Sequence, residues 1–338
     1  MSPWTRNEQI DDIRPALLAA AEGPEPFALA TIVAADGGPR PVGTQMVVTH
    51  AERTGFLSGG CIEGDVACHA RAVIAEGRPR RLVYGRSSPF IDIRLPCGGQ
   101  LVVLVERLAP GDRAITALEH LSAARRPAFY ASDGYQRATT ATAWRGSDRW
   151  PARALFVPRQ RLIVVGTDPF ALALVTLAEA LGWKAVLLPP AAADPARLAE
   201  ADPWTAIAIL THDTATEVAL LAAVLRSDAG FVGVMGSRSR IAARRARLLQ
   251  AGVPEPLIGR LRAPIGLEIG ARAPMEIATA IVGEIIAASG ATPGSRVIRP
   301  RPVTAQQQPE KSLNQASISR SMTGHAPSSA AKRAISCR

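Results

Sequence analysis

Residues 161–171 read RLIVVGTDPFA, and this stretch decides the fold of the second half of the chain. Residues 162–165 form a continuous apolar run, as a strand buried on both faces of a parallel sheet does. Gly166 follows directly, and residues 170–181 then have the length and apolar content of a helix. A strand, a glycine turn and a helix in this order are typical of the first unit of a Rossmann-like fold.

The same alternation continues through the second half of the chain. We expect strands at residues 185–188, 206–210 and 231–235, and helices at residues 218–225, 239–251 and 274–288. Asp213 is expected to cap the helix that follows it. Strands that alternate with helices predict a doubly wound parallel sheet over residues 161–289.

The first half of the chain mixes helices and strands less regularly. We expect helices at residues 13–21, 58–76 and 114–124, and strands at residues 28–34, 44–49, 80–84, 91–93 and 101–106 and near Phe129 and Ala138. This pattern predicts an N-terminal α/β domain over residues 1–144. Residues 145–160 mix Trp, Pro, Gly and Arg without a clear period and are assigned to a linker. Residues 290–338 lack apolar periodicity, which predicts a disordered C-terminal tail.

The composition allows a large core and an anionic partner. The chain has 338 residues, of which 47% are hydrophobic and 4% aromatic, so the core must consist mainly of Ala, Val, Leu and Ile. A formal net charge of +10 is compatible with nucleic acid, a membrane surface or a phosphorylated cofactor. Basic and aromatic residues do not alternate, and helix-turn-helix and RNP signatures are absent, so nucleic-acid binding is not expected.

The termini, apolar runs and cysteines bear on localisation. Residues 1–12 are charged and are not expected to form a signal peptide. The longest apolar stretches have the length of a strand, so no membrane association is expected. Four cysteines in a chain of this length predict reduced thiols in the cytoplasm. A functional cysteine is therefore expected to act as a thiolate.

The dinucleotide fingerprint that should follow the strand at residues 162–165 is damaged. Gly166 and Ala171 occupy the first and last positions of Gly-x-Gly-x-x-Gly/Ala, but Asp168 replaces the middle glycine. A carboxylate there repels a pyrophosphate and takes up its space. The next strand ends at Pro189 and Pro190, where an acidic residue would bind a ribose. We therefore predict that NAD(P) binding is weak or absent and that this element is a structural scaffold.

The segment Ser58-Gly59-Gly60-Cys61-Ile62-Glu63-Gly64-Asp65 is the first candidate site. Gly59 and Gly60 permit positive φ or close approach to a ligand. Cys61 falls at the start of an expected helix, where exposed N–H groups and the positive dipole end favour a thiolate. Glu63 and Asp65 suit the first helical turn but would oppose the thiolate if they faced the sulfur. The alternative is a tight turn with a buried cysteine.

A second cysteine also lies beside paired glycines, in Cys97-Gly98-Gly99 in front of a strand. Two such loops in one domain can converge on one ligand. Cys68 lies seven residues after Cys61 on the same helical stripe and is expected in the core. Zinc is not favoured, because the sequence has no Cys-x-x-Cys, and His69, the neighbour of Cys68, is expected to point to another side of the helix.

Two basic segments are candidates for anion binding. Arg40 lies between prolines and near glycines, so it can be held stiffly against a phosphate; the alternative is a solvated turn residue. Gly236-Ser237-Arg238 precedes a helix, whose N–H groups could bind a phosphate. The alternative there is a serine cap and a solvated basic face, which Arg244, Arg245 and Arg247 extend.

Taken together, these segments resemble the XdhC/CoxI family. The resemblance rests on Gly37-x-Pro39-Arg40 with Gly43-x-x-Met46, on residues 58–65, on Cys97-Gly98-Gly99 before a strand that ends at Glu106, and on Thr211-His212-Asp213, residues 233–238 and residues 263–271. It spans residues 17–287.

The resemblance implies a maturation chaperone rather than a turnover enzyme. Family members bind the molybdenum cofactor, support its sulfuration with a cysteine desulfurase, and help insert it into the apoenzyme of a xanthine dehydrogenase or carbon monoxide dehydrogenase type hydroxylase. The resemblance assigns Cys61 and Cys97 to cofactor binding. We predict that the cofactor, a pterin with or without a nucleotide, is held between the two domains: on one side the cysteine loops with Gly59, Gly60, Gly98, Gly99 and Arg40, and on the other the basic edge with Gly236, Ser237 and Arg238. A soft thiolate suits molybdenum or sulfane sulfur.

Two rival functions follow from other features. The first rival is an NAD(P)-dependent oxidoreductase with a divergent Rossmann domain. The damaged dinucleotide fingerprint argues against this function. The net charge could serve a nucleic-acid-binding or scaffold protein, although part of that charge lies in the expected tail. The sequence does not fix the oligomeric state; a homodimer is the commonest arrangement among soluble oligomers.

Overall fold

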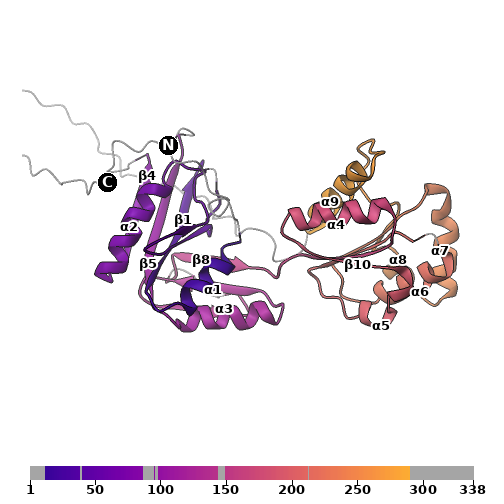
Figure 1. The fold of residues 1–338 in the computed structure, drawn as a ribbon, viewed down its shortest axis with the longest axis horizontal. Coiled ribbons are helices and arrows are strands. Elements are labelled where there is room, and N and C mark those ends of the chain that lie inside the picture. The colour runs from indigo at the N-terminus through magenta and orange to yellow at the C-terminus, as the bar shows by residue number, and fades with distance from the viewer. Residues whose placement is uncertain are drawn as a thin grey trace, which may run out of the picture.

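The protein folds into two lobes that lie side by side (Figure 1). The computed structural model describes residues 12–38, 40–86, 95, 98–143, 149–211 and 213–289. The expected strand at residues 91–93 and the expected tail lie outside these ranges. Within them, none of the helices combines the length and the apolarity that a bilayer crossing requires.

An antiparallel five-stranded sheet forms the centre of the N-terminal lobe. Its order is β3 (Arg53–Thr54), β2 (Gln45–Val48), β1 (Phe27–Asp36), β5 (Gln100–Leu108) and β4 (Arg80–Gly85). Helix α2 (Glu63–Glu76) packs on one face, where Val66, Ala70 and Val73 meet alternate residues of the strands in a buried cluster. These strands alternate between two buried faces, which explains the predominance of Val, Leu and Ile.

The opposite face of this sheet is covered by two helices and a second sheet. These elements are α1 (Arg14–Glu22), α3 (Arg113–Ala123) and an antiparallel sheet in the order β7 (Arg137–Thr140), β6 (Ala128–Ser132) and β8 (Ala152–Phe156). Residues 145–160 were expected to form a linker. The structure instead pairs β8 with β6, so this part of the stretch is an ordered strand of the N-terminal lobe.

A buried polar network joins the two sheets of this lobe. Glu106 is fully buried on β5 and accepts hydrogen bonds from Tyr130 Oη at 2.9 Å, Ser132 Oγ at 2.5 Å and Arg137 Nε at 2.9 Å. Arg137 Nη1 also donates to Asp112 Oδ2 at 2.8 Å. Burial raises the pKa of Glu106, and Arg137 opposes that effect. The charge of this carboxylate therefore depends on Arg137.

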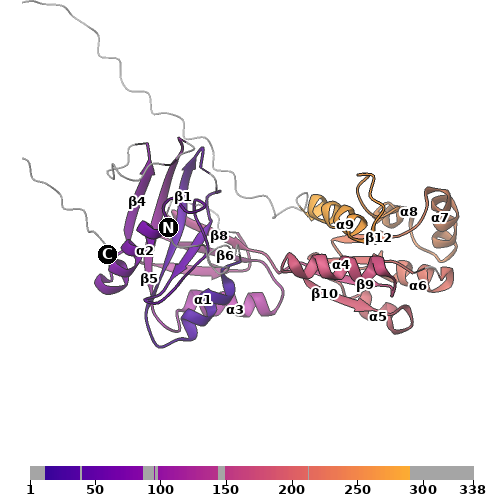
Figure 2. The same ribbon diagram turned by 45° about the horizontal axis from the view of Figure 1, so that its top comes forward.

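The C-terminal lobe contains the predicted parallel sheet. The order is β10 (Lys184–Leu188), β9 (Arg161–Val165), β11 (Thr205–Ile209), β12 (Phe231–Val234) and β13 (Leu261–Arg262), and every neighbouring pair is parallel. Helices α4 (Pro169–Ala180) and α9 (Pro274–Ser289) cover one face, and α5 (Pro195–Leu198), α6 (Thr214–Val224), α7 (Ile241–Gln250) and α8 (Glu255–Ile258) lie on the other (Figure 2). The Rossmann-like α/β architecture is confirmed.

The direction of these strands determines where each loop lies. The first residues of β9 and β10 lie at the junction with the N-terminal lobe, and the strands run away from it (Figure 1). Helix α7, which follows β12, lies at the far end of the molecule in both ribbon views. The carboxyl edge of the parallel sheet therefore faces away from the N-terminal lobe.

Replacing Arg137 by Ala should strongly destabilise the N-terminal lobe. The change leaves the buried Glu106 carboxylate without its cation, so we expect the free energy of unfolding to fall by about 3–5 kcal/mol. Urea denaturation measures this change. The matched control is Arg107→Ala, which removes the same charge from an exposed position next to Glu106 and should change stability little. Equal losses in both variants would contradict the network's role.

Candidate functional site: a glycine-cysteine loop held by a buried carboxylate

The loop that carries Cys61 is wrapped around the carboxylate of Glu63. Oε1 and Oε2 accept hydrogen bonds from the backbone N–H groups of Leu57, Ser58, Gly59, Gly60 and Ile62, over 2.6–3.2 Å, and from Ser58 Oγ at 2.8 Å. The N–H of Cys61 donates to Ser58 Oγ at 3.0 Å. Glu63 itself is 2% exposed. The loop is therefore fixed by a residue that belongs to the core.

This network changes the electrostatic expectation for Cys61. The sequence predicted free N–H groups at the start of α2, available to a thiolate or a ligand. In the structure α2 begins at Glu63, two residues after Cys61, and the N–H groups of the preceding loop already bind the Glu63 carboxylate. Burial acts to raise the pKa of Glu63, but the hydrogen bonds from Ser58 and Leu57 outweigh it and hold the pKa below its usual value.

Cys61 is the outward-facing group of this loop. Gly59 and Gly60 have φ values of +86° and +114°, which side chains rarely adopt. A Cβ added at Gly59 would meet no atom within 4 Å, so the need for glycine there is conformational. Cys61 is exposed and carries a free thiol. The alternative of a buried cysteine in a tight turn is wrong for this residue.

Arg40 lies beside the same loop. Its guanidinium carbon is 4.3 Å from the ring centroid of Phe56, a cation–π contact. Phe56 lies two residues before Ser58, so the contact links the turn at residues 37–41 to the cysteine loop. The structure therefore brings two of the expected segments together.

The second glycine loop packs against the same turn. A Cβ added at Gly99 would lie 2.6 Å from the Gly37 carbonyl oxygen and 2.8 Å from that of Asp36, so the two backbones are in direct contact. Gly98 has a φ of +67° and donates its N–H to the Leu95 carbonyl at 2.9 Å. Cys97 lies outside the described residues. Gly98, Gly99, Arg40 and the Cys61 loop thus lie at one end of the N-terminal sheet.

The remaining cysteine of the described N-terminal lobe differs from expectation. Cys68 is half-buried on α2 and takes part in a disulfide bond, where the sequence predicted a reduced thiol in the core. Among the described residues, His, Cys, Asp and Glu side chains do not gather in groups of three that could hold a metal ion.

The glycine turn of the Rossmann lobe is closed from within the protein. Asp168 is the N-cap of α4, and its Oδ1 accepts the N–H of Ala171 at 2.8 Å. A Cβ added at Gly166 would lie 3.1 Å from Leu210 Cβ, so this glycine serves close strand–helix packing. The Asp168 carboxylate thus occupies a donor that a dinucleotide pyrophosphate would need.

The loop Gly236-Ser237-Arg238 lies at the carboxyl edge of the parallel sheet, after β12. Ser237 Oγ and Ser239 Oγ are 2.7 Å apart, and Arg238 pairs with Glu268. Because this edge faces away from the N-terminal lobe, one chain does not bring the loop and Cys61 into one pocket. The expectation that they share a pocket is wrong for the single chain.

Arg244 is the residue that sequence reasoning missed at this edge. It was grouped with a solvated basic face, but its side chain is 5% exposed, whereas Arg245 is exposed and pairs with Glu255. Arg244 Nε and Nη2 donate to Glu217 at 2.6 and 3.0 Å. Arg244 Nη1 is buried without a hydrogen-bond partner among the described residues. A Cβ added at Gly236 would lie 3.4 Å from this nitrogen. In the sequence, only the position of Arg244 on the side of α7 that faces α6 could have suggested that its side chain is buried.

The end of the neighbouring strand matches the expectation. Asp213 is the N-cap of α6, and its Oδ2 accepts the N–H of Thr216 at 3.0 Å. His212, its neighbour in the resemblance, lies outside the described residues. Asp213 is therefore a capping residue.

Comparison with known proteins agrees with this architecture. The XdhC and CoxI family model matches residues 20–85, and the XdhC Rossmann domain model matches residues 162–285. The molybdenum cofactor insertion chaperone PaoD of Escherichia coli K12 is 31% identical over 295 residues, which cover 83% of this chain and 91% of PaoD. A protein of Bacillus subtilis, described as a probable xanthine dehydrogenase subunit, is 25% identical over 322 residues, covering 79% of this chain and 94% of that protein.

A solved structure shares the two-lobed fold. The crystal structure described as a xanthine dehydrogenase from Bacillus halodurans has a TM-score of 0.64 at 25% identity, over 84% of this chain and 99% of that chain. The fold and the glycine-cysteine loop define a protein with a cysteine-bearing N-terminal lobe and a Rossmann-type C-terminal lobe. Together with the relatives above, they show that the chain belongs to the XdhC and CoxI family.

Replacing Glu63 by Gln should loosen the cysteine loop. One acceptor oxygen becomes an NH₂ donor that faces the donors of the loop, so we expect a loss of about 1.5–3 kcal/mol in unfolding free energy. Amide hydrogen exchange at Gly59 and Gly60 should become faster, which mass spectrometry of peptides can measure. Glu76→Gln, at the exposed end of the same helix, is the control. Unchanged exchange in the Glu63 variant would show that the carboxylate does not fix the loop.

The same carboxylate predicts a pH dependence of stability. Because its folded pKa lies below the unfolded value of 4.5, its contribution is complete above that value and is lost as the pH falls through the folded pKa. Urea unfolding between neutral pH and about pH 3 should therefore show a steeper loss of stability in the wild type than in Glu63→Gln. Identical slopes in the two proteins would contradict the lowered pKa.

Proposed function

We propose that this protein is a molybdenum cofactor insertion chaperone whose cofactor-contacting group is Cys61. The single observation that carries the proposal is an exposed free thiol on a rigid, glycine-flanked loop, held by Glu63 and lying beside Arg40. A thiolate is a soft ligand that suits molybdenum, and a guanidinium suits a phosphate. The likeness to PaoD, which is described as a molybdenum cofactor insertion chaperone, supports it.

The loop is suited to handing a ligand over rather than keeping it. Among the described residues, His, Cys, Asp and Glu side chains form no group of three that could hold a metal, so the protein would add few ligands to a cofactor that brings its own. Gly59 and Gly98 have open space where a side chain would stand, so a ligand could approach both backbones. Few protein ligands, one of them on an exposed loop, permit release to a client.

Several finer features belong to the same proposal. We propose that the client is the apoenzyme of a xanthine dehydrogenase or carbon monoxide dehydrogenase type hydroxylase, and that a cysteine desulfurase supplies sulfur while the cofactor is held. We place these events in the cytoplasm and expect the chain to act as a homodimer. Cys97, beside Gly98 and Gly99, is proposed as a second cofactor contact, which requires its reduced form.

The Rossmann lobe is assigned a supporting role. The Asp168 cap on α4 argues that NAD(P) binds weakly or not at all at the glycine turn. The loop at Gly236, with the buried Arg244 Nη1 beneath it, is proposed as an anion contact for a phosphate or for the nucleotide of a dinucleotide form of the cofactor. Because it faces away from Cys61, it would act as a separate contact within one chain.

Loss of Cys61 should strongly reduce cofactor retention without unfolding the protein. We expect protein produced in cells with intact cofactor synthesis to co-purify with pterin and molybdenum, and Cys61→Ala to retain at most about a tenth of both, the effect of losing one contact worth about 1.4 kcal/mol. Fluorescence of the oxidised pterin and elemental analysis measure the two contents.

The control is Cys337→Ala, which replaces a cysteine of the expected tail. It should keep full pterin and molybdenum contents. Because the Cys61 side chain is exposed, we expect Cys61→Ala to have a melting temperature close to that of the wild type. Such a value would show that the variant is folded. Equal contents in the wild type and Cys61→Ala would remove Cys61 from the function.

A further inference from the structure

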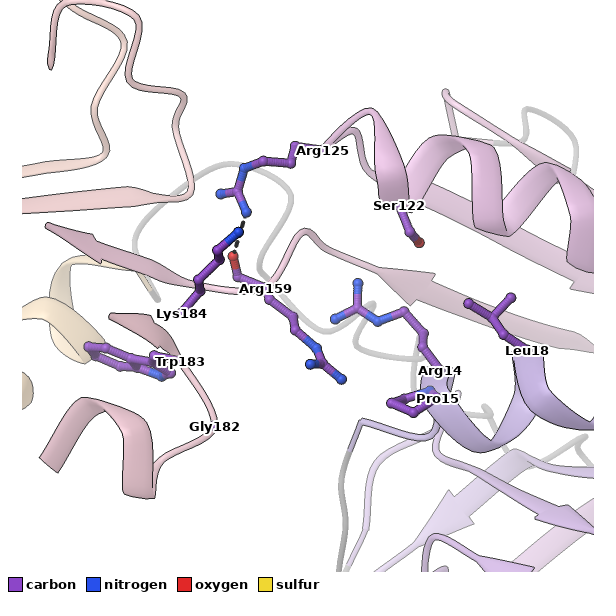
Figure 3. A pocket seen from close by; sticks show the side chains of 9 residues that line it. All are labelled: Arg14, Pro15, Leu18, Ser122, Arg125, Arg159, Gly182, Trp183 and Lys184. Carbon is purple, nitrogen blue, oxygen red and sulfur yellow. Dashed lines mark hydrogen bonds between the residues drawn. The ribbon is translucent and has the colours of Figure 1, made fainter. Parts of the chain in front are cut away.

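A cavity lies between the two lobes, at the edge of the parallel sheet opposite to the Gly236 loop. It has a volume of about 490 Å³. Its walls come from α1, the end of α3, the connection at Arg159 and the turn between α4 and β10 (Figure 3). The volume lies in the range of small-molecule sites, which is about 300–1,000 Å³.

The cavity is lined by cations from both lobes. Arg14 and Arg125 come from the N-terminal lobe, Lys184 comes from the start of β10, and Arg159 lies on the connection between the lobes. Figure 3 shows the guanidinium groups of Arg14 and Arg159 directed toward the same space. Leu18, Pro15 and Trp183 add apolar wall. This lining suits a ligand that has an anionic group and an apolar part.

Hydrogen bonds across the junction hold these walls in place. Arg125 Nε and Nη2 bind Asp202 at 2.5 and 3.1 Å, and Arg125 Nη1 donates to the Arg159 carbonyl at 3.1 Å (Figure 3). Arg14 Nη1 donates to the Val157 carbonyl at 2.7 Å. Burial acts to raise the pKa of Asp202, but the hydrogen bond from Arg125 contributes to lowering it below its usual value. Asp202 is therefore ionised at neutral pH and keeps the lobes connected.

Several donors of the lining remain available after these contacts. Within the described part of the chain, Lys184 Nζ has no hydrogen-bond or ion-pair partner. Arg159 uses only Nε, which binds Asp12 Oδ2 at 2.7 Å, and its Nη1 and Nη2 are unused within the same part. Ser122 Oγ is buried and has no partner among the described residues. An acceptor on a ligand would satisfy this buried hydroxyl.

We propose that this cavity binds a phosphorylated small molecule that carries a planar ring. One phosphate would bind Lys184 Nζ, a second anionic group would bind the free nitrogens of Arg159, and the ring would lie against Trp183. Because the lining belongs to both lobes and to their connection, the bound molecule would link them and favour the arrangement seen here.

This site is independent of the proposed cofactor contact. Lys184 is the first residue of β10, at the amino edge of the parallel sheet, whereas Asp168 and Gly236 lie at the carboxyl edge. Its lining also contains no cysteine among the described residues. Loss of either site should therefore leave the other intact, so the two proposals can fail separately.

Calorimetric titration of the full-length protein tests this proposal, with ADP and inorganic pyrophosphate as probes. We expect saturable binding of both, with ADP tighter because its ring adds contacts. Lys184→Ala should weaken both affinities roughly tenfold, as expected for the loss of one hydrogen bond to a charged group. Cys61→Ala should bind both probes as the wild type does. Higher salt should weaken binding, because the contacts are partly exposed ion pairs.

The matched control is Arg197→Ala, which removes a cation from an exposed position of the same lobe, where its side chain is 87% exposed. It should leave both affinities unchanged. Lys184 is itself exposed, so its replacement should not unfold the protein. Absence of saturable binding, equal affinities for ADP and pyrophosphate, or equal losses in the Lys184 and Arg197 variants would each overturn the proposal.

Discussion

The binding of the Glu63 carboxylate to the backbone of the loop before it is the interaction on which the candidate site depends. A carboxylate that accepts several N–H groups fixes their positions, because each hydrogen bond to a charged acceptor is worth about 1.5–3 kcal/mol. Glu63 is the first residue of α2, whose apolar side packs on the sheet. The loop is therefore anchored to the core although it lies at the surface, and Cys61 is presented to solvent by a rigid support.

The two lobes divide the chemistry of the molecule between them. The N-terminal lobe gathers the cysteine loop, Arg40 and the glycines at residues 98–99 at one end of its sheet. The parallel sheet of the other lobe runs away from the junction, which leaves its carboxyl edge at the far end and its amino edge facing the cavity between the lobes (Figure 1). This orientation, rather than the identity of any residue, separates the candidate anion contacts.

Most of the fold could be predicted from the sequence, because apolar periodicity and buried strand runs are local signals. The parallel sheet and α4 follow from residues 161–181 in this way. Strand β8 could not be predicted, because its pairing with β6 is a long-range contact in a stretch without a clear period. The roles of Glu63 and Arg244 were also missed. Residue type placed both near the site, but which way each side chain points is decided by packing.

The central claim is that Cys61 is the group that meets the cofactor, and the reactivity of its thiol tests this directly. Alkylation of Cys61 by iodoacetamide, followed by peptide mass spectrometry, can be compared between cofactor-loaded and cofactor-free protein. We predict rapid labelling of the exposed thiol in the free protein and strong protection when pterin and molybdenum are bound. Equal labelling rates in the two states would place the cofactor elsewhere and contradict the claim.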